Sequence, residues 1–124
     1  MNVFPPIRAK HFCNCGDIIG AMAALKSYYE ANNRKVILSQ QLNVPAHYYP
    51  GATHGTTHDD GSGTMVCMNR AIFDMIRPLI ISQEYIQDMD EYAGQEDIAI
   101  DIDVIRKKTF VNLVLYSFIL FFNY

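Results

Sequence analysis

The sequence predicts an α/β domain with a parallel sheet, and two observations carry that prediction. First, residues 9–39 pass from a short strand through a glycine-containing turn into a helix, and then into a β-branched strand. A strand, a helix and a strand within about 30 residues form a βαβ unit, whose strands are parallel and whose crossover is right-handed. Second, residues 97–103 alternate isoleucine with aspartate or alanine, which indicates a further half-buried strand.

Composition and charge limit the class of protein. The chain has 124 residues, of which 50% are hydrophobic and 19% charged, with only 7 glycines and 5 prolines, so a single packed domain is expected. The formal net charge of −3 gives no basic surface for nucleic acid, which is therefore not expected as a partner. The 3 cysteines form no disulfide framework, and residues 1–6 lack a secretory signal pattern, so a reducing cytoplasmic location is expected.

The first half of the chain is organised around the βαβ unit. We expect an opening arm over residues 1–8, a domain over residues 9–110 and an apolar tail over residues 111–124. Within the domain, residues 9–13 are predicted as a strand, followed by a helix whose apolar residues recur at helical spacing and whose N-cap or first-turn acid is Asp17. Asn32 and Asn33 close that helix, and residues 35–39 form the second strand.

The second half begins with a loop. Residues 42–63 contain 2 of the prolines and 4 of the glycines and show no periodic pattern, which predicts a long surface loop. Residues 65–68 are expected to form a short buried strand. Residues 71–76 start a helix that Pro78 either bends or separates from a second helix. Another extended stretch begins at Tyr85.

Two segments resemble a known family. Residues 15–26, Cys-Gly-Asp-Ile-Ile-Gly-Ala-Met-Ala-Ala-Leu-Lys, resemble the start of the heptosyltransferase-like glycosyltransferases, the ADP-heptose:lipopolysaccharide heptosyltransferases, where a loop ending in Gly-Asp precedes the first helix. Residues 78–86, Pro-Leu-Ile-Ile-Ser-Gln-Glu-Tyr-Ile, resemble that family's helix ending in Pro-Leu-Leu and the Gln-x-Tyr-Ile strand after it. The resemblance covers residues 10–107.

The resemblance implies a Rossmann-like domain, the acceptor-side half of a two-domain GT-B glycosyltransferase. The other half of such an enzyme holds the nucleotide-sugar donor, so this chain is expected to bind no cofactor, to be inactive alone, and to have a sugar acceptor or a separate donor-binding domain as its partner. The loop at residues 13–15, Cys-Asn-Cys, departs from the Ser- and Gly-rich loop of the family. The tail resembles no part of the family pattern, and we expect a truncation or a shifted reading frame there.

The same resemblance gives Asp17 the role of catalytic base. Transfer of a sugar to a hydroxyl requires a base beside the attacking oxygen, and the family's Gly-Asp carboxylate is the group proposed for this. The backbone N–H groups of Gly16 and Ile18, at the start of the helix, are candidates for the approach of a phosphate or an acceptor oxygen. In the alternative interpretation, Asp17 only caps the helix and Gly16 only forms a turn.

Other polar clusters have simpler explanations. His54, His58, Asp59 and Asp60 carry metal-ligand side chains, but the intervening glycine and threonines disfavour a helix that would bring the two imidazoles together, so no metal site is predicted. Cys13 and Cys15 lack the two-residue spacer of redox and zinc motifs and are expected to be small apolar residues. The aspartates of residues 97–103 are explained by a solvated strand face.

A second functional class stays open from the residues alone. The chain could be a stand-alone α/β binding or interaction module whose apolar tail docks on a partner or a membrane. Residues 106–108, Arg-Lys-Lys, precede the tail and would hold an anionic membrane surface weakly. The tail itself is shorter than the roughly 20 residues that a spanning helix needs.

Overall fold

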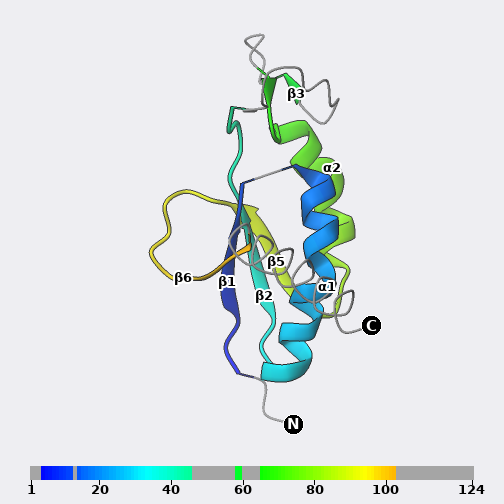
Figure 1. The fold of residues 1–124 in the computed structure, drawn as a ribbon, viewed down its shortest axis with the longest axis vertical. Coiled ribbons are helices and arrows are strands. Elements are labelled where there is room, and N and C mark those ends of the chain that lie inside the picture. The colour runs from blue at the N-terminus through cyan, green and yellow to red at the C-terminus, as the bar shows by residue number, and fades with distance from the viewer. Residues whose placement is uncertain (1–3, 13, 46–57, 60–64, 103–124) are drawn as a thin grey trace, which may run out of the picture.

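The computed structural model describes residues 4–12, 14–45, 58–59 and 65–102. Four of its strands form one sheet in the order β5-β2-β1-β6, and each neighbouring pair is parallel (Figure 1). Two shorter strands, β3 and β4, form a separate antiparallel pair. The elements are β1 (Ile7–His11), α1 (Cys15–Asn32), β2 (Val36–Gln40), β3 (His58–Asp59), β4 (Met65–Val66), α2 (Arg70–Ile81), β5 (Ile86–Glu91) and β6 (Ile98–Asp101).

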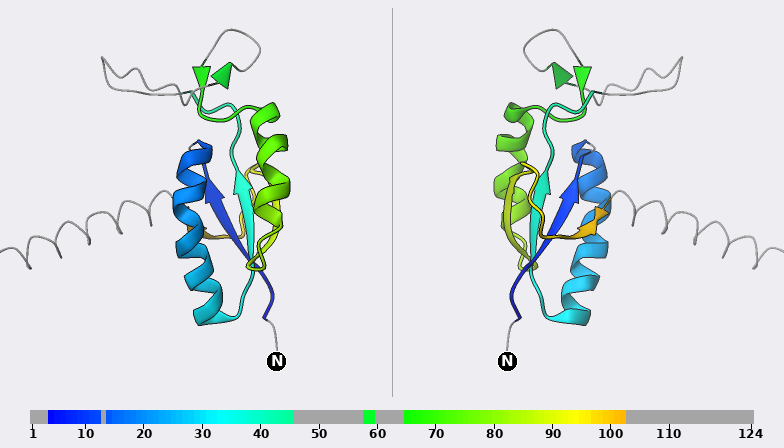
Figure 2. Two further views of the ribbon diagram at one scale, coloured as in Figure 1. Left: turned by 90° about the vertical axis from the view of Figure 1, so that its right-hand side faces the viewer. Right: turned by 90° about the vertical axis from the view of Figure 1, so that its left-hand side faces the viewer.

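The strand order shows an α/β fold consistent with a Rossmann-like domain. The chain steps from β1 to β2 to β5 in one direction and then returns to place β6 on the other side of β1. The first four strands of the Rossmann fold follow this order. Helices α1 and α2 lie on one face of the sheet, and the connection from β5 to β6 passes on the opposite side (Figures 1 and 2).

The hydrophobic core lies between the sheet and the two helices. Alternate strand residues face the helices, and Ala9, Val36 and Leu38 among them are completely buried. Full burial of each large aliphatic side chain stabilises the fold by about 1.5–3 kcal/mol. The core cluster is completed by Ile18, Ala21, Leu25, Met68, Phe73, Ile80, Tyr85, Ile86, Met89 and Ile102.

Helix α1 begins earlier than its apolar pattern indicates. Asn14, not Asp17, is the N-cap, because its Oδ1 atom accepts a hydrogen bond from the Asp17 N–H at 3.1 Å. Asp17 is therefore the acidic residue of the first turn, the second of the two places predicted for it. At the other end, Asn33 adopts φ 53° and its N–H donates to the Tyr29 carbonyl, which confirms the predicted end of the helix.

Helix α2 continues through its proline. Asn69 caps it, with Oδ1 accepting from the Ile72 N–H at 2.9 Å, and Pro78 lies inside the helix rather than between two helices. A proline has no N–H to donate to the carbonyl four residues earlier, but its own carbonyl still accepts from the Ser82 N–H at 3.2 Å.

Several element boundaries differ from the sequence-based ones. Strand β1 begins at Ile7, so Arg8 belongs to the sheet and not to an opening arm, and β2 runs one residue later than predicted. The segment predicted as one long loop contains β3, and Pro45 forms a β-bridge with Val66. β4 does not join the main sheet. It pairs with β3, and its residue Val66 also forms the bridge to Pro45.

Neither helix in the described part of the chain is long and apolar enough to cross a membrane. The predicted tail over residues 111–124 lies outside the described residues, as do Cys13, His54, Asp60 and Asp103.

Candidate functional site at the carboxyl edge of the sheet

The carboxyl ends of the parallel strands meet at one edge of the sheet. β1, β2 and β5 end there at His11, Gln40 and Glu91, and the helices that follow β1 and the β3–β4 hairpin both start there (Figure 1). In open α/β sheets, ligands bind outside this edge, at the point where the strand order reverses. Here that point lies beside β1, where the chain leaves for α1.

Asp17 lies at this edge, in the first turn of α1. Its backbone is fixed by Asn14, whose side chain accepts from the Asp17 N–H and whose carbonyl accepts from the Ile18 N–H at 3.3 Å. The next side chain, Ile18, is 1% exposed and anchors the helix start in the core. Asp17 is half-buried, so its carboxylate is partly accessible at a defined place after β1.

The two predicted backbone positions beside Asp17 differ. Gly16 is exposed, and a Cβ atom there would lie 3.3 Å from Asn14 Oδ1, the atom that caps the helix. A glycine therefore leaves the cap unobstructed. The N–H of Ile18 already donates to the Asn14 carbonyl, which makes Gly16 the better placed of the two for an approaching oxygen.

A buried polar pair, which the residue pattern alone did not single out, closes the ends of β1 and β2. His11 and Gln40 are register partners, both are 0% exposed, and His11 Nδ1 lies 2.6 Å from Gln40 Oε1. The Gln40 amide also donates from Nε2 to the Gln41 carbonyl at 3.0 Å. The signal available in the sequence was a polar residue at the last inward-facing position of each strand, after Ile7 and Ala9 in β1 and after Val36 and Leu38 in β2.

Backbone hydrogen bonds join the residues that follow this pair to the segments on either side of the β3–β4 hairpin. The Gln41 N–H donates to the His11 carbonyl at 2.8 Å, and the Asn43 N–H donates to the Met68 carbonyl at 2.9 Å. Cys67 N–H donates to the Val44 carbonyl at 2.8 Å, and Met68 is 0% exposed. The segment after β2 and the segment before α2 are therefore joined by backbone hydrogen bonds beyond the ends of β1 and β2.

Charged groups on β5 and α2 complete this edge. Arg70, the first residue of α2, forms an ion pair with Glu91 at the end of β5, and its guanidinium lies 5.0 Å from the centre of the Phe73 ring. Lys10 places its ammonium 4.6 Å from the centre of the Tyr92 ring. These contacts connect the ends of β1 and β5 with the start of α2.

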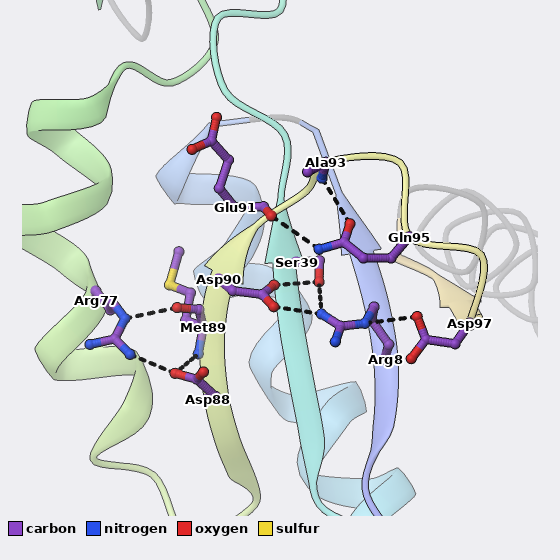
Figure 3. A network of polar contacts seen from close by, with 10 residues as sticks. All are labelled: Arg8, Ser39, Arg77, Asp88, Met89, Asp90, Glu91, Ala93, Gln95 and Asp97. Carbon is purple, nitrogen blue, oxygen red and sulfur yellow. Dashed lines mark hydrogen bonds and ion pairs between the residues drawn. The ribbon is translucent and has the colours of Figure 1, made fainter.

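The opposite face of the sheet carries an ion network centred on Arg8 (Figure 3). Arg8 Nη1 donates to Asp90 Oδ2 at 2.6 Å and to Ser39 Oγ at 2.7 Å, and Nε donates to Asp97 Oδ1 at 3.0 Å. Ser39 Oγ donates in turn to Asp90 Oδ1 at 2.5 Å. The hydrogen bond to Asp90 raises the pKa of the Arg8 guanidinium above its usual range, although burial opposes this.

This network changes the interpretation of the acidic strand. Asp97, expected on a solvated face, is an ion-pair partner of Arg8, although its side chain is 69% exposed. In the part of the chain that the structure describes, no three His, Cys, Asp or Glu side chains form a group that could hold a metal ion. Cys15 packs half-buried against the core, in keeping with its expected apolar role.

Comparison with known proteins identifies no relative: no family model matches the chain, and neither the curated proteins nor the solved structures contain a match. The resemblance to the heptosyltransferase-like glycosyltransferases therefore rests on the two sequence segments alone.

Proposed function

We propose that the chain is the acceptor-side, Rossmann-like half of a sugar-nucleotide-dependent glycosyltransferase of the GT-B type, with Asp17 as its catalytic base. The observation that carries the proposal is the place of Asp17: it lies in the first helical turn after β1, at the carboxyl edge where the strand order reverses. The Gly16-Asp17 pair stands at the corresponding place in the family that the sequence resembles.

The reaction needs few groups from this half. The acceptor hydroxyl oxygen forms a bond to the anomeric carbon of the donor sugar, the bond from that carbon to the diphosphate oxygen breaks, and the hydroxyl proton passes to a base. The Asp17 carboxylate accepts this proton late in the reaction, because the hydroxyl becomes acidic only as its oxygen forms the bond to the anomeric carbon. Compensation of the leaving diphosphate charge falls to the donor-binding half.

A transfer assay with two separate chains tests the base. The chain is combined with the separately produced donor-binding domain of a heptosyltransferase-like enzyme, ADP-heptose and a lipopolysaccharide core oligosaccharide that lacks heptose. Asp17→Asn should lower turnover by about 10²-fold or more while acceptor binding is retained, since removal of a general base typically costs 10²–10⁴-fold. Retained turnover in Asp17→Asn would refute the assignment. Glu84→Gln, on an exposed residue just after α2, is the matched control.

The second functional class also has an observation in its favour. Three large apolar side chains on the helices are mostly exposed: Ile19 at 69%, Met75 at 63% and Leu79 at 70%. An interaction module would use such residues together with the tail. Flotation with anionic lipid vesicles tests this alternative: binding that is lost both on deletion of residues 111–124 and in Met75→Lys would favour it over the transferase.

A further inference from the structure

We propose that His11 is a positioning residue for Asp17, acting through its buried hydrogen bond to Gln40; the role assigned rests on the proposed function. The side chains of His11 and Gln40 are 0% exposed and 2.6 Å apart, at the point where β1 leaves the sheet. Replacing both partners of such a buried pair by apolar side chains of the same shape can be nearly neutral or stabilising, so stability alone does not account for the pair at this strand end.

The hydrogen bonds around the pair determine which atom carries the proton. Gln40 Nε2 donates to the Gln41 carbonyl, so the amide oxygen of Gln40 is the atom that faces His11. An amide oxygen only accepts, and therefore His11 Nδ1 must be the donor. Neutral His11 is consequently held as the Nδ1–H tautomer, which fixes both the rotation of the ring and the direction of its Nε2 lone pair.

The pair then determines where the loop to α1 begins. The Gln41 N–H bonds to the His11 carbonyl, so both the side chain and the backbone of His11 are attached to β2. Three residues later Asn14 caps α1 and holds the Asp17 N–H. With Ile18 anchored in the core, the segment that carries Asp17 has a fixed point on each side. A shift of His11 along or away from β2 would move Asp17 relative to the acceptor.

Two substitutions separate the donor from the shape of the ring. His11→Asn keeps an N–H donor close to the position of Nδ1 but loses the ring, whereas His11→Phe keeps a ring and loses the donor. The ¹⁵N-labelled full chain is measured without ligand, by the amide shifts and hydrogen exchange of Gly16, Asp17 and Ile18. The imidazole ¹⁵N shifts of His11 report its tautomer directly. Urea unfolding shows how far each variant remains folded.

In the wild type, the imidazole ¹⁵N shifts of His11 should be those of the Nδ1–H tautomer. The Asp17 amide shift should stay close to wild type in His11→Asn. In His11→Phe it should be displaced, and the Asp17 amide should exchange at least tenfold faster. The proposal is overturned by an Nε2–H tautomer, by wild-type Asp17 amides in folded His11→Phe, or by equal disturbance in the two variants. If His11→Phe does not fold, Gln40→Met, which removes the acceptor, takes its place with the same criteria.

A titration with the heptose-free core oligosaccharide separates this proposal from the proposed function. If the wild type does not bind the oligosaccharide, the acceptor-side assignment fails, and the amide shifts in the free protein still decide whether His11 positions Asp17. If the wild type binds, affinity should fall at least tenfold in His11→Phe and less than threefold in His11→Asn. Equal affinities in wild type and His11→Phe would contradict a positioning role.

Discussion

Arg8 on β1 and Asp90 on β5 form an ion pair across the intervening strand β2, with 2.6 Å between Nη1 and Oδ2. Ser39 on β2 lies between them and bonds to both. Arg8 also donates a hydrogen bond to Asp97 (Figure 3). It therefore links β5 to Asp97, the last residue of the connection between β5 and β6. That connection, residues 92–97, contains no helix, so side-chain contacts hold it on this face of the sheet.

Removal of this network should destabilise the fold. We expect Arg8→Ala to lower the free energy of unfolding by about 2 kcal/mol, because three charge-assisted hydrogen bonds are lost from a side chain that is only 15% exposed. Arg70→Ala is the matched control: its pair with Glu91 is about half-exposed on both sides and should contribute about 0.5 kcal/mol. Equal losses in urea unfolding of the two variants would contradict a special role for Arg8.

Two glycines should respond in opposite directions to alanine. Gly94, in the β5–β6 connection, has φ 81°, which an alanine adopts only with strain, so Gly94→Ala should destabilise by about 1 kcal/mol. Gly20 lies within α1 with nothing within 4 Å of an added Cβ, so Gly20→Ala should stabilise by about 0.5–1 kcal/mol. Thermal unfolding of both variants measures the two changes in stability. Changes in the same direction would disprove the conformations assigned to the two glycines.

Ionisation of the buried Tyr85 phenol should destabilise the fold at alkaline pH. Burial raises the pKa of Tyr85 above its usual value of 10.0. Above that value the unfolded chain loses the proton while the folded protein keeps it, so stability declines as pH rises from about 10 towards the folded pKa. Below about pH 10 this contribution is constant. Urea unfolding of wild type and Tyr85→Phe from pH 8 to 11 measures this: wild type should lose stability relative to Tyr85→Phe only above about pH 10.

Pro78 should be a weak point of α2. An alanine at this place restores an N–H donor to the carbonyl four residues earlier and removes the clash of the ring with it. Because Pro78 is exposed and inside the helix, we expect Pro78→Ala to stabilise the protein by about 1–2 kcal/mol. Leu79→Ala, at an exposed neighbour, should change stability by less than about 0.5 kcal/mol. A loss of stability in Pro78→Ala would show that the ring itself contributes to packing.

Apart from β3, the order of the elements along the chain was predictable because it depends on local periodicity. The βαβ unit, the end of α1 at Asn33 and the strand within residues 97–103 all follow from apolar spacing and turn residues close in sequence. The same holds for Asp17, whose place in the first turn depends only on α1 starting where it does.

The polar contacts were not predictable in the same way. Arg8 and Asp90 are 82 residues apart, and they meet only because β2 alone separates β1 from β5 in the sheet. His11 and Gln40 meet through the register of β1 with β2, which a shift by one residue would destroy. Sequence patterns fix neither strand order nor register, so the groups that these create were missed.

The carboxyl edge beside Asp17 is the proposed site of a sugar acceptor, and an NMR titration of the ¹⁵N-labelled chain with the heptose-free lipopolysaccharide core oligosaccharide is its decisive test. We expect saturable shifts centred on the amides of Gly16 and Asp17, with acceptor binding retained in Asp17→Asn and no shifts around Arg8 on the opposite face. An absence of saturable shifts, or shifts centred on the exposed residues Met75 and Leu79, would exclude an acceptor site at this edge.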